Sequence, residues 1–178
     1  MNAAERLVES TRELLWERGY VGTSPKAIQQ RAGSGQGSMY HHFSGKQDLA
    51  LAAIRRTAEE MRARAEEQFS APGTPMDRIT AYLRRERDVL KGCPIGRLTQ
   101  DPDVMTDPAL RAPVEETLAW LRQRLAGIVA ETGTGLDPQA VAATIVATLQ
   151  GGYVLARAAD SAEPFDQAIS GVLSLLTR

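Results

Sequence analysis

Apolar side chains recur with a helical period along almost the whole chain. Near its start, Leu7, Thr11 and Leu14 share one face of a predicted helix, charged side chains take the opposite face, and Gly19 is expected to end it. Later segments repeat this amphipathic pattern, and none shows the convincing alternation of a β-strand. The pattern therefore predicts an all-α protein of about nine helices.

Proline, glycine and capping residues mark where the helices begin and end. Thr23 and Ser24 precede Pro25, which predicts the start of a short helix that ends near Ala32. A glycine turn follows, in which we expect the Ser34 hydroxyl to cap the next helix. The predicted helices after that turn cover residues 36–43, 46–69, 76–91, 108–131, 137–159 and 164–177, with a short one after Pro94.

The other segments are expected to be connections. The run at 71–75, Ala-Pro-Gly-Thr-Pro, is predicted to be a linker, 101–108 a turn-rich connection, and Pro113 a bend. We divide the chain into a helix-turn-helix module, residues 1–47, and a larger helical domain, residues 48–178.

The composition is that of an ordinary soluble globular protein, with 43% apolar and 24% charged residues. A single cysteine, Cys93, excludes an internal disulfide and a multi-cysteine metal site. The first residues lack the apolar core of a signal peptide, and no stretch approaches ~18 uninterrupted apolar residues. We therefore expect a cytoplasmic protein with no membrane partner.

Charge is distributed unevenly along the chain. The formal net charge is −1, which by itself argues against nucleic acid. Between Thr23 and Arg56, however, five basic residues face the single acid Asp48. This local excess favours a nucleic-acid partner, although a chance cluster is the alternative.

Three short-to-medium helices, the last two joined by a tight glycine turn, form a predicted helix-turn-helix. In such a unit the last helix enters the major groove of double-stranded DNA while the one before it crosses the backbone. Gln36, Ser38 and His41 can reach base edges, and Gly37 lets the backbone approach closely. Met39 and Phe43, four residues apart, are expected to point into the module's own core.

Two segments resemble the DNA-binding signature of the tetracycline-repressor (TetR) family. They are the run from Thr23 to Gly33 and the Gly-x-x-Tyr-x-His-Phe-x-x-Lys pattern from Gly37 to Lys46. The chain departs from the family in having Ser34 where an apolar residue is usual and Gly35 where a cap is usual.

The resemblance implies that Tyr40 and His42 contact phosphates. Lys46 is expected to do the same, because its ammonium and the start of its helix both favour an anion. Thr23, Ser24 and Lys26 are further phosphate candidates, and such contacts position the protein without reading sequence. The neighbours His41 and His42 point ~100° apart on a helix, so we expect no metal ion there.

The resemblance also implies a small-molecule pocket in the helical domain and a homodimer formed by the last two helices. The segment Gly92-Cys93-Pro94 is similar to one in a branch that includes lincomycin- and flavonoid-responsive repressors. Ordinary core packing is the alternative for each pocket candidate, and Cys93 has a redox role as a further alternative. The pocket candidates are Met61, Tyr82, Cys93, Leu98, Trp120, Thr148 and Tyr153. The candidate dimer residues, for which a thick monomer core is the alternative, are Leu149, Val154, Leu155, Ile169, Val172, Leu173 and Leu176.

We interpret the chain as a ligand-responsive transcriptional regulator. The expected activity is repression, relieved when a small apolar effector releases the dimer from a near-palindromic operator. No glycine-rich phosphate loop, catalytic triad or metal cluster is recognisable, so we expect neither an enzyme nor a cofactor. The alternative is a helical protein-interaction or small-molecule-binding module without specific DNA binding.

Overall fold

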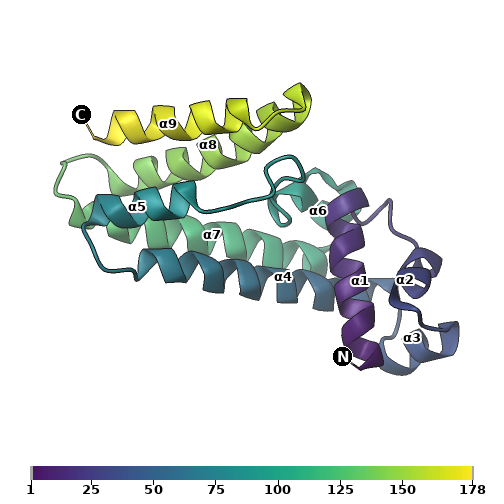
Figure 1. The fold of residues 1–178 in the computed structure, drawn as a ribbon. Helices are drawn as coiled ribbons and strands as arrows, with labels where there is room; N and C mark the ends of the chain where they lie inside the picture. The colour runs from purple at the N-terminus through teal and green to yellow at the C-terminus, as the bar shows by residue number, and fades with distance from the viewer. Residues whose placement is uncertain (1, 178) are drawn as a thin grey trace. The chain divides into compact units, whose positions relative to one another are not determined.

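The computed structural model describes residues 2–177, which form nine α-helices, one 3-10 helix and no strand (Figure 1). This confirms the predicted all-α class. The residues group into two compact units, one containing residues 1–60 and 94–116 and the other residues 61–93 and 117–178. The boundary between the units falls inside two long helices, α4 (Lys46–Phe69) and α7 (Pro108–Glu131).

The first three helices, α1 (Ala3–Arg18), α2 (Pro25–Ala32) and α3 (Gln36–His42), pack around a small apolar core (Figure 1). Met39 is fully buried in this core and Phe43 packs against it, as the four-residue spacing predicted. Because α3 buries only this apolar face, its remaining faces are free to take other partners. The buried core residues are Leu7, Leu14, Ile28, Ala32, Met39 and Leu49.

The turn between α2 and α3 is a Schellman motif. Gly33 adopts a left-handed conformation at φ 57°, and the Ser34 N–H donates to the Gln29 carbonyl at 3.0 Å. The cap of α3 is Gly35, and no side chain caps the helix. The prediction that the Ser34 hydroxyl caps α3 is therefore wrong, because the Schellman turn places Gly35 at the cap position.

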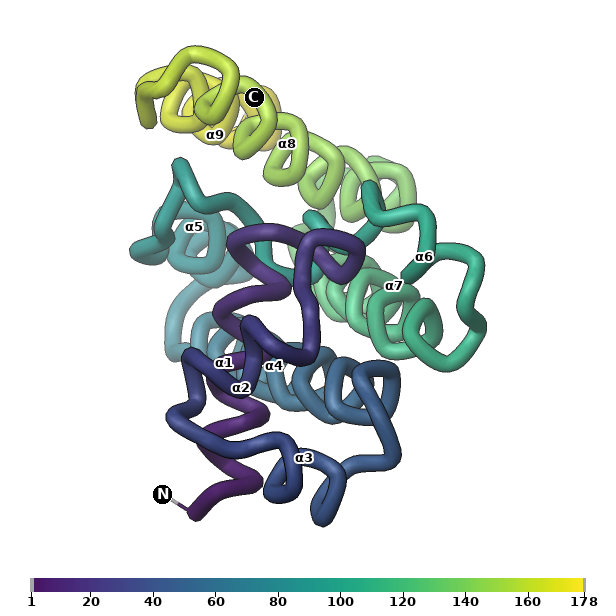
Figure 2. Tube along the Cα trace, turned by 90° about the vertical axis from the view of Figure 1, so that its right-hand side faces the viewer, coloured from purple at the N-terminus to yellow at the C-terminus, as the bar shows by residue number. Residues whose placement is uncertain are grey.

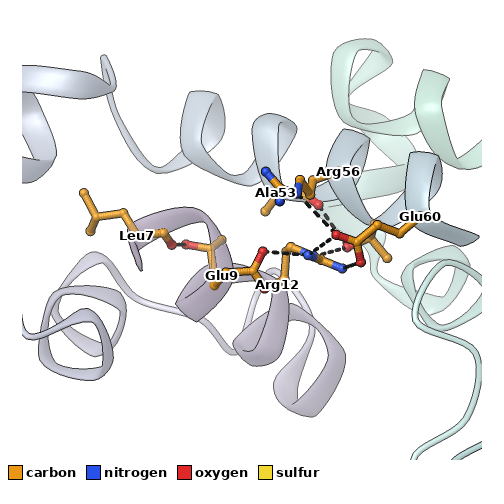
Figure 3. A network of polar contacts seen from close by, with 8 residues as sticks. Leu7, Glu9, Arg12, Ala53, Arg56 and Glu60 are labelled. Carbon is orange, nitrogen blue, oxygen red and sulfur yellow. Dashed lines mark hydrogen bonds and ion pairs between the residues drawn. The ribbon is translucent and has the colours of Figure 1, made fainter. Parts of the chain in front are cut away.

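A polar network joins α1 to the part of α4 that lies in the first unit (Figure 3). The Arg12 guanidinium makes a two-pronged ion pair with Glu60 and also donates to Glu9 Oε1 at 2.6 Å. Its Nε donates to the Thr57 hydroxyl at 3.1 Å. The planar fork of arginine suits this geometry, so the network fixes the angle at which α1 crosses α4 within the first unit.

The segment 101–108, predicted as a turn-rich connection, contains a short helix, and the short helix predicted after Pro94 is a 3-10 helix. A 3-10 helix, η1 (Gly96–Gln100), is followed at once by α6 (Pro102–Thr106). Asp101 caps α6 by accepting from the Asp103 and Val104 N–H groups, and Pro102 occupies the first turn. The Asp-Pro pairs at 101–102 and 107–108 thus begin helices, because they combine an N-cap carboxylate with a proline that needs no donor.

The second unit contains α5 (Pro75–Arg84), α8 (Pro138–Ala159) and α9 (Glu163–Leu176) with the adjoining parts of α4 and α7. The prediction that the helix of 76–91 continues to Lys91 is wrong, since α5 ends at Arg84. Arg87 folds back and donates to the Leu83 carbonyl at 2.9 Å and to the Tyr82 carbonyl. Its guanidinium satisfies carbonyls that a longer helix would have bonded through backbone N–H groups.

Helices α8 and α9 lie side by side as an antiparallel pair (Figure 2). Gly152 makes their close approach possible, because a Cβ at this position would lie 2.9 Å from Phe165 Cδ2. By length and composition α8 is also apolar enough to cross a membrane, the one such helix in the described chain. Its buried residues recur at helical spacing on one side, the pattern of a helix packed against its own unit.

Candidate nucleic-acid interface

The surface of α3 is polar and open on the side away from the core. Gln36, Tyr40 and His41 are exposed, Tyr40 to 52%. Gly37 and His42 are also exposed, whereas Ser38 is half-buried. The structure therefore brings the predicted base-reading residues and the predicted phosphate contacts of α3 together on one short helix.

The glycines at the start of α3 have no role in the protein's own packing. Gly35 and Gly37 adopt backbone conformations open to any residue, and a Cβ at either position would meet nothing within 4 Å. Glycine in a helix nevertheless costs roughly 0.5–1 kcal/mol relative to alanine. Close approach of an external partner explains this composition, because a glycine backbone can come nearer to a base edge or a phosphate.

Of the three phosphate candidates at the start of α2, two are exposed and one is buried. Ser24 is exposed and caps the helix by accepting from the Ala27 N–H at 3.1 Å, which leaves its hydroxyl proton available. Lys26 is exposed as well. Thr23, by contrast, is 1% exposed and donates its hydroxyl to the Gly19 carbonyl at 2.6 Å. The predicted Thr23 phosphate contact is therefore corrected to a structural role in the turn before α2.

Lys46, at the N-terminus of α4, is held within the first unit. Its ammonium lies 3.9 Å from the centroid of the Tyr20 ring, a cation–π contact. Burial lowers the pKa of Lys46, while the charges of Asp101 and Asp103 act in the opposite direction. The ammonium is thus held against Tyr20, next to the N-terminus of α4.

Ion pairing reduces the positive charge that the sequence places around the module. Arg31 makes a two-pronged contact with Glu17, each N–O distance being 2.8 Å. Arg56 lies 3.3 Å from a Glu60 oxygen that Arg12 also binds. The local excess of base over acid in the sequence therefore overstates the free charge of this unit.

The adjacent histidines stack edge to face at a centroid distance of 4.8 Å. In residues 2–177, no group of three or more His, Cys, Asp or Glu side chains is placed to hold a metal ion.

Asp101 is a residue that the sequence analysis missed. It is buried, and its Oδ2 accepts from the Tyr20 and Val21 N–H groups at 2.7 and 3.0 Å. Its other oxygen caps α6, so one carboxylate ties the α1–α2 turn to the segment 94–116 of the same unit. The Asp-Pro pair was interpreted as part of a turn-rich connection, and no sequence signal gives a partner some eighty positions away.

Six of the seven pocket candidates lie in the second unit, whereas Leu98 is buried in the first. Tyr82, Cys93 and Tyr153 are buried, and Met61, Trp120 and Thr148 are half-buried. The Cys93 and Met61 sulfur atoms lie 4.0 Å apart. Aromatic contacts join Tyr82 to Phe69 at 4.7 Å and Phe69 to Trp120 at 6.2 Å between ring centroids. These candidates thus belong to an aromatic, sulfur-rich interior.

Two arginines in this interior were not predicted. The guanidinium carbons of Arg85 and Arg87 lie 5.1 and 5.3 Å from the Tyr82 ring centroid. The sequence Arg84-Arg85-Glu86-Arg87 reads as the solvated side of a helix, and only the early end of α5 turns two of these residues inward.

A short helix with an open polar side, presented by a three-helix core after a tight glycine turn, defines a helix-turn-helix DNA-binding protein. Comparison with known proteins agrees. Residues 7–53 match the model for bacterial regulatory proteins of the tetR family, and residues 74–172 match the tetracyclin repressor-like C-terminal domain. The chain belongs to the TetR family of bacterial transcriptional regulators.

Relatives are similar over nearly the full chain. The HTH-type transcriptional regulator LmrA of Bacillus subtilis is 26% identical, covering 99% of this chain and 98% of its own. The HTH-type transcriptional repressor DhaR of a Mycobacterium species is 24% identical, and the match covers 97% of this chain and 91% of DhaR. Among solved structures, a TetR transcriptional regulator from Chloroflexus aurantiacus is 29% identical, with a TM-score of 0.86 over 99% and 94% of the two chains.

Proposed function

We propose that the chain is a homodimeric, cytoplasmic repressor that binds a near-palindromic operator and leaves it when a small molecule binds. In this proposal residues 1–47 bind DNA, and residues 48–178 bind the effector and form the dimer. The observation that carries it is the polar, glycine-containing side of α3, which is exposed and serves no internal packing.

The dimer is proposed to form through α8 and α9. Val154 and Leu155 on α8 and Leu175 on α9 are 67%, 54% and 67% exposed, an unusual density of large apolar side chains on one helix pair. A two-fold axis would pair this surface with itself in an isologous four-helix interface. Two α3 helices would then stand about one DNA turn apart, roughly 34–36 Å.

The effector is proposed to control DNA binding by binding more tightly to one of two dimer geometries. A ligand that binds better to the form with the wrong α3 spacing shifts the population away from the DNA-binding form. Helix α4 contains Lys46 at one end and pocket candidate Met61 further along, so it is the element through which we propose the two functions are coupled.

Electrophoretic mobility shift with the DNA upstream of the chain's own gene tests the proposal. Affinity is expected to fall steeply with salt, because binding releases counterions from phosphates. Tyr40→Ala should weaken binding to every duplex, whereas Gln36→Ala should mainly reduce the preference for the upstream sequence over unrelated DNA. Failure of the wild-type dimer to shift any duplex at low salt would refute the regulator function.

A further inference from the structure

Arg85 and Arg87 have buried donors that no protein acceptor satisfies. The Nε and Nη1 atoms of Arg85 and the Nε atom of Arg87 are inaccessible to solvent and have no hydrogen-bond partner in residues 2–177. Buried polar groups in folded proteins are almost always paired, because an unpaired donor loses its bonds to water. Three such atoms lie on two neighbouring side chains, and an acceptor from outside the chain, either an ordered water or a ligand, would satisfy them.

The charge of this pair is also uncompensated. Within the described residues, every ion pair involves other side chains, and no carboxylate oxygen lies within 4.0 Å of either guanidinium. Burial lowers the pKa of Arg87, and the neighbouring charge of Arg85 acts in the same direction. Two like charges in a partly buried site are unfavourable unless an anion joins them.

An internal structural role accounts for only part of the arrangement. Arg87 uses its two terminal nitrogens to bind the carbonyls of Tyr82, Leu83 and Arg85, which explains its place at the end of α5. Neither Nε nor Nη1 of Arg85 has an acceptor in the described chain, and its guanidinium lies beside the Tyr82 ring. Packing alone therefore leaves Arg85 unexplained.

The surroundings suit the rest of a small organic molecule. Tyr82 is almost completely buried beside Phe69, and Tyr153 packs against Phe165 at 4.9 Å between ring centroids. Burial raises the pKa of the Tyr153 phenol, and the nearby Arg87 charge opposes that shift. Buried aromatic side chains next to a pair of arginine donors match the chemistry of a ligand with an apolar body and one charged end.

We propose that the effector is an organic anion, whose carboxylate or ionised phenolic oxygen is held by Arg85 and Arg87 while its apolar body packs beside Tyr82. This inference rests on the proposed function, in which the second unit binds the effector. The inference restricts the expected effector from any small apolar molecule to an apolar molecule that also has a negatively charged group.

Thermal unfolding of the full chain with paired probes tests the ligand chemistry. Benzoate, salicylate and octanoate are each compared with the corresponding neutral amide at equal ionic strength. We expect at least one acid to raise the Tm where its amide does not. In Arg85→Gln the affinity for that acid should fall about tenfold or more, since a hydrogen bond to a charged group is lost. Arg84→Gln, an exposed neighbour on α5, should leave it unchanged.

The ligand-free protein provides a second test that does not depend on the choice of probe. Arg85→Met keeps an apolar stem against Tyr82 and removes the uncompensated charge, so it should raise the Tm, while Arg84→Met should not. The inference is overturned if Arg85→Met lowers the Tm, if acids and amides act alike or not at all, or if Arg85→Gln binds the acid as the wild type does.

DNA binding measured on the same proteins keeps the two proposals distinguishable. Arg85→Gln should bind the upstream DNA with wild-type affinity when no acid is present. If the wild type binds that DNA but no acid stabilises it, the anion inference alone fails. If an acid binds through Arg85 but no duplex binds, the regulator function fails.

Discussion

At the scale of single residues, glycine composition is the most informative feature of the DNA-binding module. Gly33 has φ 57° and is required by the turn, whereas Gly35 and Gly37 are required by neither backbone nor packing. The fold therefore explains Gly33, and we propose that close approach of DNA explains Gly37.

Gly37→Ala is predicted to separate stability from binding. Alanine should raise the free energy of unfolding by roughly 0.5–1 kcal/mol, because it favours the helix and has room for its methyl group. The same methyl group should reduce DNA affinity by blocking close approach. Chemical denaturation and a DNA titration measure the two effects.

Gly127→Ala on α7 is the matched control, since this glycine is also exposed with nothing near its Cβ position. It should stabilise the protein and leave DNA affinity unchanged. Unchanged DNA affinity in Gly37→Ala would show that α3 does not approach DNA through this residue.

The residue scale also shows what sequence reasoning could reach. The exposure of Gln36, Tyr40 and His41 follows from helical period once Met39 is placed in the core. The burial of Thr23 and the inward turn of Arg85 do not follow, because each depends on carbonyls or rings supplied by packing. The local sequence pattern therefore predicts which face of a helix is buried, whereas the hydrogen-bond and ring partners of a side chain depend on how the helices pack.

At the scale of elements, helix ends marked by strong signals were predicted well. The predicted bounds of α4 and α7 are those observed, since lysine after a Ser-Gly break and proline after aspartate leave little choice. The end of α5 was missed because its stop signal is a side chain, Arg87, binding backbone carbonyls from beyond the helix. No glycine or proline stands at residue 85 to indicate it.

The pairing of α8 with α9 depends on Gly152. We predict that Gly152→Ala lowers the Tm, because the new methyl group would lie 2.9 Å from a Phe165 ring carbon and force the helices apart. The expected loss is about 1–3 kcal/mol of unfolding free energy. Thermal and urea unfolding measure it.

Gly151 is the neighbouring control, exposed and with nothing within 4 Å of its Cβ position. Gly151→Ala should stabilise the monomer fold slightly through helix propensity. Equal effects of the two substitutions would contradict the close α8–α9 contact.

The α1–α4 network predicts an acid-sensitive contribution to stability. Its hydrogen bond with Arg12 lowers the pKa of Glu60 below the ordinary value of about 4.3. The ion pair thus stabilises the fold at pH values above the ordinary glutamate pKa. This stabilisation is lost as the pH falls through the lowered pKa of Glu60 in the folded protein. Glu60→Gln should cost about 1 kcal/mol at pH 7, because the pair is partly exposed, and the cost should vanish in acid.

Glu59→Gln, on the exposed side of α4, controls for the loss of one negative charge. Urea unfolding between pH 7 and pH 3 compares the three proteins. A difference between Glu60→Gln and wild type that persists at the acid end would show that the ion pair is not its source.

At the scale of the whole molecule, family, fold and site agree on a transcriptional regulator. The chain matches the family models in both its N-terminal and C-terminal parts and keeps the architecture of relatives that share about a quarter of its residues. Sequence reasoning reached this class because the α2–α3 segment has a stringent local pattern. The buried positions of Arg85 and Arg87 were not predicted, because the helical domain contains no comparable local motif around them.

The central claim is that two α3 helices of one dimer enter successive major grooves. Hydroxyl-radical footprinting of the DNA upstream of the chain's own gene tests it most directly, with Tyr40→Ala as the control protein. We expect two protected segments of similar sequence, centred about one helical turn apart and lost in the variant. Uniform cleavage with the wild-type protein, or protection that Tyr40→Ala leaves intact, would contradict it.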